Sequence, residues 1–175
     1  MITFVRLDSY FQKSNAMKKL IVAFVLLAVS AVCVNAQDLS KLSKAARAAY
    51  NYLKEDGYKP EIDEDNDVVF KAEGTWFYLD NYPKDDTYLK MTLPEIFEVD
   101  MDNARQKNAA LYACNEITRS KKLLRAYMWK DGTVEFSTST YIPSSGEVDE
   151  FVSASIEYML AAVTSWMEVY SNALE

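Results

Sequence analysis

The chain has 175 residues, half of them apolar, with 26 acidic residues against 19 basic residues and a formal net charge of −7. This length suits one domain with one sizeable core and is short for two. The acidic balance argues against nucleic acid as a partner. The absence of histidine excludes Ser-His and Cys-His catalysis and histidine metal sites.

The first 36 residues are typical of a secretory signal that follows a stretch without a pattern of its own. Lys18 and Lys19 precede an uncharged, mostly apolar run over 20–34, and Ala36 offers a cleavage position. We expect Met17 to be the true start and cleavage to follow Ala36. The run is shorter than the roughly 20 apolar residues of a membrane helix. The sequence therefore predicts a periplasmic or secreted protein with no membrane contact after signal removal.

Residues 37–175 are predicted to form a single domain. They contain 15 basic and 25 acidic residues, a net charge of about −10, which disfavours nucleic acid and anionic lipid as partners. Cys114 is the only cysteine in this part, so no internal disulfide is expected. Its place on the apolar stripe of a predicted helix favours burial as a small hydrophobe over a reactive thiol.

A helix is predicted over 38–56, with Gly57 at its C-terminal cap. Its apolar residues share one stripe: Leu39, Leu42, Ala45, Ala46, Ala49 and Leu53. Alternating apolar residues and turn signals then predict a meander of three or four strands. In order, the segments are a short strand at 59–62, an acidic turn at 63–67, a strand from 68 to 72, a reversal at Glu73-Gly74, a strand over 75–82, a reversal at 83–86 and a strand over 88–93. Pro94 is expected to end the last strand, and 95–101 to be a connector that packs under the next helix.

The stretch over 103–141 predicts a helix to about Ser120 followed by a β-hairpin. The register of the hairpin depends on its loop. A two-residue Asp-Gly turn would place Met128 opposite Glu135, whereas a three-residue loop with Gly132 in the left-handed conformation places Met128 opposite Val134. We choose the three-residue loop, because it collects the aliphatic side chains on one face of the hairpin.

The last predicted element is a long helix that opens with a capping-box spacing from Ser144 to Glu147 and runs to about Asn172. Its apolar stripe is wider than one sheet face requires, which suggests a second contact surface and a homodimer through this helix. Together the elements predict an α+β fold, with an antiparallel sheet of five to six strands and three helices on one face. The predicted order is α-β-β-β(-β)-α-β-β-α.

Four short segments resemble the YbjN-like family of bacterial sensory transduction regulators, whose fold is similar to that of type III secretion chaperones. They are the run over 52–58 at the end of the first helix, Val68-Val69-Phe70 after the acidic turn, the run over 113–117 and the run over 127–134. The resemblance covers most of 38–174. It implies a regulatory or chaperone-like role and supplies no catalytic motif. The predicted signal peptide departs from the family pattern, because an exported protein cannot chaperone a secretion substrate in the cytoplasm.

The sheet face that the helices leave free is the candidate binding surface. Strand alternation directs seven aromatic residues outward together: Trp76, Tyr78, Tyr82, Tyr88, Tyr127, Trp129 and Tyr141. Lys71, Lys90, Arg125 and Glu135 are expected to border them. Tyrosine and tryptophan are enriched at binding surfaces. The alternative is that β-propensity explains these residues and that loops or a second subunit cover them.

Two acidic clusters are weaker candidates for chemistry. Asp63-x-Asp65-x-Asp67 resembles the start of a calcium loop, but Val68 stands where that loop needs glycine and Gly74 where it needs glutamate. We interpret it as a solvated turn and predict no metal. The second cluster lies in 95–102: Glu95, Glu98, Asp100 and Asp102. Helix capping explains part of it, so we predict no catalytic residues and no cofactor.

These features predict an exported, non-enzymatic binding or regulatory protein that holds a protein segment on its aromatic sheet face. The partner is expected to be another protein or a second subunit. A carbohydrate-binding module that stacks sugars on the same aromatics is one alternative. A small hydrolase that uses the acidic connector over 95–102 is the other.

Overall fold

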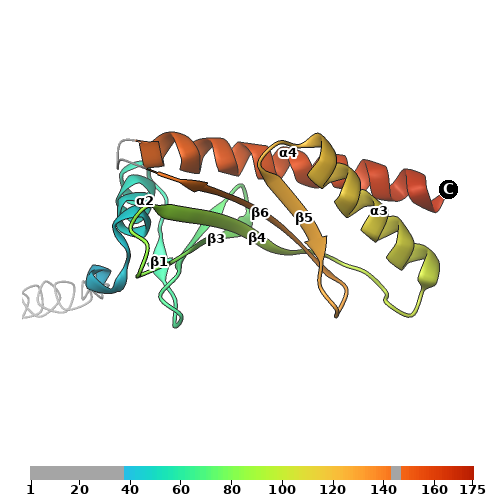
Figure 1. Cartoon of the computed structure of the whole chain (residues 1–175), viewed down its shortest axis with the longest axis horizontal. Helices are drawn as coiled ribbons and strands as arrows, with labels where there is room; N and C mark the ends of the chain where they lie inside the picture. The colour runs from blue at the N-terminus through green and yellow to red at the C-terminus, as the bar shows by residue number, and fades with distance from the viewer. Residues whose placement is uncertain (1–37, 143–146) are drawn as a thin grey trace, which may run out of the picture. The chain divides into compact units, whose positions relative to one another are not determined.

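The structure, a computed structural model, describes residues 38–142 and 147–175 (Figure 1). The predicted start at Met17, the cleavage after Ala36 and the capping residue Ser144 lie outside the described residues. The elements are a 3-10 turn η1 (Leu39–Lys41), α2 (Lys44–Glu55), β1 (Glu61–Ile62), β2 (Val68–Ala72), β3 (Thr75–Asp80), β4 (Tyr88–Glu98), α3 (Ala104–Ser120), β5 (Leu124–Met128), β6 (Thr133–Tyr141) and α4 (Val148–Leu174). No helix in these two stretches combines the length and apolar character that a membrane crossing requires.

The strands form one antiparallel sheet in the order β1-β2-β3-β4-β6-β5. The long helix α4 packs against α2 and α3 and against strands β4 and β6 (Figure 1). The predicted α+β class, with helices on one face of the sheet, is confirmed. The core lies between that face and the helices, where period-2 strand residues meet period-3.6 helix residues. Its largest fully buried side chains include Trp166, Phe70, Phe77, Phe136 and Met91.

The β5–β6 hairpin has the predicted register. Met128 pairs with Val134 and Ala126 with Phe136. The loop is closed by the Trp129 N–H, which donates to the Thr133 carbonyl at 2.8 Å. Gly132 has a φ of +96°, the left-handed conformation that a three-residue loop needs at this place. The hairpin therefore directs its aliphatic residues toward the core and Tyr127 and Glu135 to the other face.

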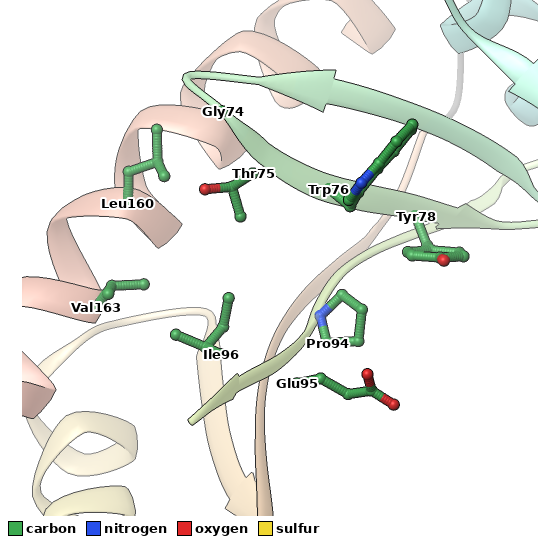
Figure 2. A pocket seen from close by; sticks show the side chains of 9 residues that line it. All are labelled: Gly74, Thr75, Trp76, Tyr78, Pro94, Glu95, Ile96, Leu160 and Val163. Carbon is green, nitrogen blue, oxygen red and sulfur yellow. The ribbon is translucent and has the colours of Figure 1, made fainter. Parts of the chain in front are cut away.

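We predicted that strand β4 ends at Pro94. In the structure it continues to Glu98. Its pairing with β6 is irregular between Leu93 and Phe97, and Glu95 has a φ of +50°. Proline is tolerated in a strand at such a bulge because no ladder bond is required of its missing N–H. In Figure 2 the bulged segment of β4 diverges from β3. This irregular segment positions both pockets described below.

We also predicted that the connector over 95–101 packs under the helix that follows it, α3. Its aromatic stacking contact is instead with α4. Phe97 stacks on Trp166 of α4, with ring centroids 4.3 Å apart. Trp166 is buried, and its Nε1–H donates to Cys114 Sγ on α3 at 3.3 Å. Cys114 is buried, as predicted, and burial raises the pKa of its thiol. This buried contact joins β4, α3 and α4.

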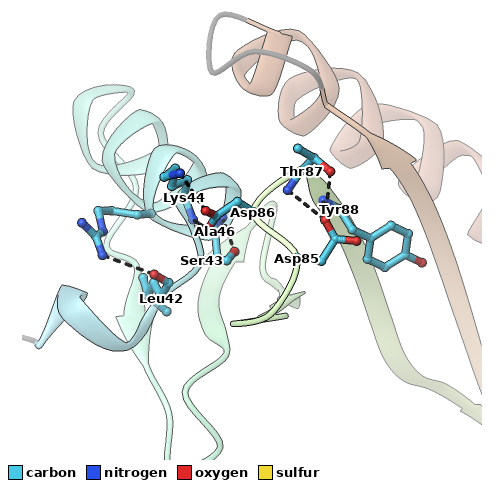
Figure 3. Close-up of polar contacts among 9 residues, drawn as sticks. Leu42, Ser43, Lys44, Ala46, Asp85, Asp86, Thr87 and Tyr88 are labelled. Carbon is cyan, nitrogen blue, oxygen red and sulfur yellow. Dashed lines mark hydrogen bonds and ion pairs between the residues drawn. The ribbon is translucent and has the colours of Figure 1, made fainter.

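The first helix is shorter than the predicted 38–56, because the chain caps a new helix at Ser43. The Ser43 Oγ accepts a hydrogen bond from the Ala46 N–H at 3.2 Å, so α2 begins at Lys44 (Figure 3). The Asp86 carboxylate accepts from the Lys44 N–H at 3.0 Å and pairs with its Nζ at 2.8 Å. Gly57 follows the helix with a φ of +90°, as a C-terminal cap requires. The start of α2 is thereby fixed to the loop between β3 and β4.

Candidate functional site

The sheet has one face against the helices and one face without helices, which we call the outer face. Side chains that point to the helices are buried: Phe70, Phe77, Leu79, Leu89, Met91, Leu124, Val134 and Phe136. Met128, which was placed with them, is half-buried at the end of β5. Their neighbours along each strand therefore project from the outer face, because successive strand residues alternate.

All seven predicted aromatic residues lie on or beside the strands of the outer face. Trp76, Trp129 and Tyr141 are 50%, 52% and 70% exposed. The other four are half-buried: Tyr78 on β3, Tyr82 just after β3, Tyr88 at the start of β4 and Tyr127 on β5. The structure thus keeps large aromatic surface accessible on this side of the sheet.

The seven residues form three groups rather than one continuous cluster. Tyr88 is the centre of the first group, with Tyr82 at 4.8 Å and Tyr141 at 5.2 Å between ring centroids. The Tyr127 and Trp129 rings form the second, edge to face at 5.3 Å. Trp76 and Tyr78, two residues apart on β3, form the third. The Lys71 Nζ lies 5.7 Å from the Trp76 ring centre, a cation–π contact.

Charged and polar residues separate these groups, and sequence reasoning missed their arrangement. Asp80 on β3 is opposite Lys90 on β4 in the register, and the Lys90 Nζ lies 2.7 Å from Asp80 Oδ2. Thr92 and Tyr82 donate to the same carboxylate through their hydroxyl groups at 3.2 and 3.3 Å. Burial lowers the pKa of Lys90, but the hydrogen bond to Asp80 and the charge of Asp80 outweigh that effect, so the pKa is raised. Asp80 and Lys90 therefore form a fixed ion pair on the outer face.

Glu135 was expected at the border of the aromatic residues and instead lies buried among them. Its side chain is only 8% exposed. The Tyr127 hydroxyl donates to Oε1, and the Trp129 Nε1–H donates to Oε2 at 3.0 Å. Burial, and then the bond to Glu135 and its charge, raise the pKa of Tyr127 far above the ordinary value for tyrosine. Tyr127 thus remains a hydrogen-bond donor at neutral pH, and both rings are held in fixed orientations.

The Tyr127–Trp129–Glu135 contacts and the Asp80–Lys90 ion pair lie beside a pocket of about 440 Å³, here called the sheet pocket. Its lining residues are Asp67, Tyr78, Asp80, Lys90, Thr92, Pro94, Glu95, Tyr127, Trp129 and Glu135. Four of them are acidic and one is basic. Burial, and then the charges of Asp80, Asp63 and Asp65, raise the pKa of Asp67, against the effect of a hydrogen bond from the Asn81 N–H. The sheet pocket therefore combines aromatic walls with net negative charge.

A second pocket, of about 480 Å³, lies where β3 and β4 diverge, and we call it the gap pocket (Figure 2). It is lined by Gly74, Thr75, Trp76, Tyr78, Pro94, Glu95, Ile96 and two residues of α4, Leu160 and Val163. The β3–β4 ladder pairs only residues 78 to 80 of β3. Trp76 therefore has no strand partner on this side. The gap pocket shares Tyr78, Pro94 and Glu95 with the sheet pocket, so the two pockets are adjacent.

One residue of each acidic cluster stabilises its own turn, while Glu95 of the second cluster lines both pockets. Asp63 Oδ1 accepts from the backbone N–H groups of Asp65 and Asp67 at 3.0 and 2.8 Å, which stabilises the turn into β2. Asp100 Oδ1 accepts from the Asp102 N–H at 3.0 Å. Asn103, not an acid of this cluster, caps α3. Within the described ranges, no three carboxylate or thiol side chains gather as a metal-binding group.

No protein-family model matches the sequence, and no curated protein matches it either. Solved structures do match. One is the type III secretion chaperone SycH of Yersinia pestis, in complex with a stable fragment of YscM2, at 12% identity over 69% of this chain and 98% of that chain, with a TM-score of 0.44. Another is an uncharacterized protein from Methanothermobacter thermautotrophicus, at 9% identity over 75% of this chain and 99% of that chain, with a TM-score of 0.50. The TM-score of 0.50 for the Methanothermobacter protein shows a shared fold alone. The resemblance to the YbjN-like family stays a prediction.

Proposed function

We propose that this chain is a non-enzymatic binding protein that holds a segment of a protein partner on its outer face. One observation carries the proposal: helices cover one face of the sheet, while the opposite face keeps Trp76, Trp129 and Tyr141 at least half exposed. Large aromatic side chains in such positions supply contact area with few rotors to order on binding. The two adjacent pockets extend that surface along the sheet, as an extended segment would need.

The surroundings of the acidic residues support a role without catalysis. Asp63 and Asp100 are engaged by backbone N–H groups of their own turns. Glu98 is exposed on β4 and is not among the residues that line the sheet pocket, whereas Glu95 is. The alternative of a hydrolase built on 95–102 predicts that Glu98→Gln with Asp100→Asn abolishes a measurable activity. Full retention of such an activity would remove that alternative.

Export and assembly belong to the same proposal. The Lys-Lys pair and the apolar run over 20–34 support a periplasmic or secreted location. A regulatory role of the kind implied by the YbjN-like resemblance fits a binding surface without catalytic residues. A second copy of this chain, docked through α4, is the proposed form of any self-association, and sedimentation of the purified mature domain would measure it.

A carbohydrate-binding role is the second candidate, because the exposed ring of Trp129 borders a pocket with polar groups that could bind hydroxyls. Stacking on an aromatic ring and hydrogen bonds to charged side chains are common to sugar and peptide recognition. A glycan array distinguishes the two. Specific signal that Trp129→Ala abolishes would favour sugar, and no signal above background would remove this candidate.

The main test is a cross-linking pull-down of the mature protein from its native envelope fraction. It compares the wild type with the double variant Trp76→Ala/Trp129→Ala and with Tyr112→Ala, which removes an aromatic side chain of similar exposure, 54%, from α3. We expect a captured protein to be lost in the double variant and kept in the control. Equal capture by all three proteins would overturn the proposal.

A further inference from the structure

The sheet pocket has a composition that selects the chemistry of its occupant. It is walled by the rings of Tyr78, Tyr127 and Trp129, and its charged residues carry a net charge of −3, from four acids and one lysine. Anionic groups are repelled by such a pocket, and an apolar side chain would leave its carboxylates without new partners. A cation is favoured, both by charge and by the negative faces of the rings.

The charge is not distributed evenly, which locates the cation more closely. Asp80 is neutralised by Lys90 at 2.7 Å. Glu135 receives only the neutral donors Tyr127 and Trp129, one on each oxygen. In the part of the chain that the structure describes, no lysine or arginine forms an ion pair with Glu135. Each carboxylate oxygen has a second lone pair, so Glu135 keeps further acceptor capacity.

From this geometry we infer that the sheet pocket receives the guanidinium group of an arginine side chain carried by the partner segment. This inference rests on the proposed function and names the partner's chemistry at one position. A guanidinium group is planar, so it stacks on aromatic faces while its N–H groups pair with a carboxylate. The lysine ammonium group is more strongly hydrated and lacks the flat face. Arginine thus uses both the rings and the carboxylate.

The net charge of about −10 over residues 37–175 complements a basic partner over longer range. The neighbouring gap pocket offers apolar side chains of Ile96, Leu160 and Val163. An apolar residue beside the arginine in the partner segment would lie over that pocket. The occupant is therefore an extended segment with one arginine and flanking apolar residues.

The test uses two peptides, acetyl-Ala-Val-Arg-Val-Ala-amide and the same peptide with citrulline, the neutral isostere of arginine. The chain has three tryptophans, whose indole N–H resonances are resolved by nitrogen NMR and assigned with Trp129→Phe. We expect the arginine peptide to shift the Trp129 signal in a saturable way and to leave the Trp166 signal unmoved, because Trp166 is buried and bonded to Cys114. The citrulline peptide should bind at least about tenfold more weakly.

Three variants complete the test. Glu135→Gln should weaken the arginine peptide about tenfold or more, and Lys90→Gln should tighten it several-fold, because Asp80 then keeps an unpaired charge. Glu168→Gln removes an exposed acid of α4 and should change nothing. Three dispersed indole signals confirm folding of each variant. Equal binding of both peptides, or no shift of Trp129, would overturn the arginine inference. The partner capture by wild type and double variant decides the proposed function separately.

Discussion

Phe97 of β4 stacks on Trp166 of α4 with ring centroids 4.3 Å apart and ring planes inclined by 14°. The Tyr170 ring extends the stack, 4.8 Å beyond Trp166. This contact fixes the end of β4 that follows its bulge to the long helix. Because that end of β4 packs on α4 and not on β3, the two strands diverge beyond the Tyr78–Thr92 pair, before Tyr78 in β3 and after Thr92 in β4. The gap pocket opens between them. The core contact and the binding surface are therefore parts of one arrangement.

Replacement of Trp166 by alanine should destabilise the domain severely. The side chain is fully buried, contacts Phe97 and Tyr170, and donates to Cys114. Truncation of a buried tryptophan costs about 3–5 kcal/mol, a large part of the 5–15 kcal/mol typical of domains. Urea unfolding followed by circular dichroism measures the loss. Trp76→Ala, at an exposed position, should cost less than about 1 kcal/mol, and similar losses for the two variants would contradict the burial described here.

Alanine at Gly132 should cost more than alanine at Gly74, although both glycines have positive φ, +96° and +82°. The left-handed conformation alone costs a residue with a Cβ about 1 kcal/mol. At Gly132 the added Cβ would also lie 2.3 Å from the Val99 carbonyl oxygen, whereas at Gly74 nothing lies within 4 Å. The end of β4 would have to move, and the hydrogen bond from the Val99 N–H to the Gly132 carbonyl would weaken. We expect about 2 kcal/mol or more for Gly132→Ala against about 1 for Gly74→Ala, measured by chemical unfolding.

The Tyr127 hydroxyl should make stability fall at alkaline pH. Its pKa in the folded domain is raised above the ordinary value of 10.0, by burial and by the bond to Glu135. The folded state therefore holds this proton more tightly, so the stabilisation is complete below pH 10 and decreases as the pH rises above it. Tyr127→Phe removes the hydroxyl group and its hydrogen bond, which should lower the free energy of unfolding by about 1 kcal/mol at neutral pH. Above pH 10 this difference in stability between variant and wild type should become smaller. Parallel stability curves for wild type and variant between pH 7 and 11 would rule this out.

Asp67→Asn should stabilise the domain at neutral pH. Burial, and then the nearby carboxylates, raise the pKa of Asp67 above 3.8, so the folded state binds its proton more tightly than the unfolded state does. That contribution is present below the unfolded pKa and is lost as the pH rises through the folded pKa. An asparagine amide oxygen can still accept from the Asn81 N–H, a bond of 2.6 Å in the wild type. The free energy of unfolding of the variant should exceed that of the wild type at pH 7, and the difference should shrink below about pH 3.8. A variant less stable than the wild type at pH 7 would contradict this prediction.

Local patterns were sufficient for most elements. Alternation in the strands and the stripe on α4 depend on neighbouring residues. The loop before β6 could be chosen because only one of the two registers places Val134 and Phe136 opposite the aliphatic residues of β5. The same register already implied that Tyr127 is opposite Glu135. That pairing was a usable signal for the buried carboxylate, which we instead expected at the border of the face.

Other features depend on contacts distant in sequence. The passage of β4 through Pro94 depends on a bulge against β6 and on the stack with Trp166, which no local pattern indicates. The helix start at Lys44 depends on Asp86 of a distant loop. The Asp80–Lys90 pair depends on the register between β3 and β4, across a loop long enough to allow several registers. The sheet pocket therefore could not be assembled from the sequence.

The most direct measurement is the dissociation constant of the captured partner for the wild type, for Trp76→Ala/Trp129→Ala and for Tyr112→Ala. Two aromatic contacts of about 2 kcal/mol each predict a loss of roughly 1,000-fold for the double variant, with wild-type affinity in the control. An unchanged dissociation constant in the double variant, or an equal loss in Tyr112→Ala, would show that the partner does not bind on the outer face.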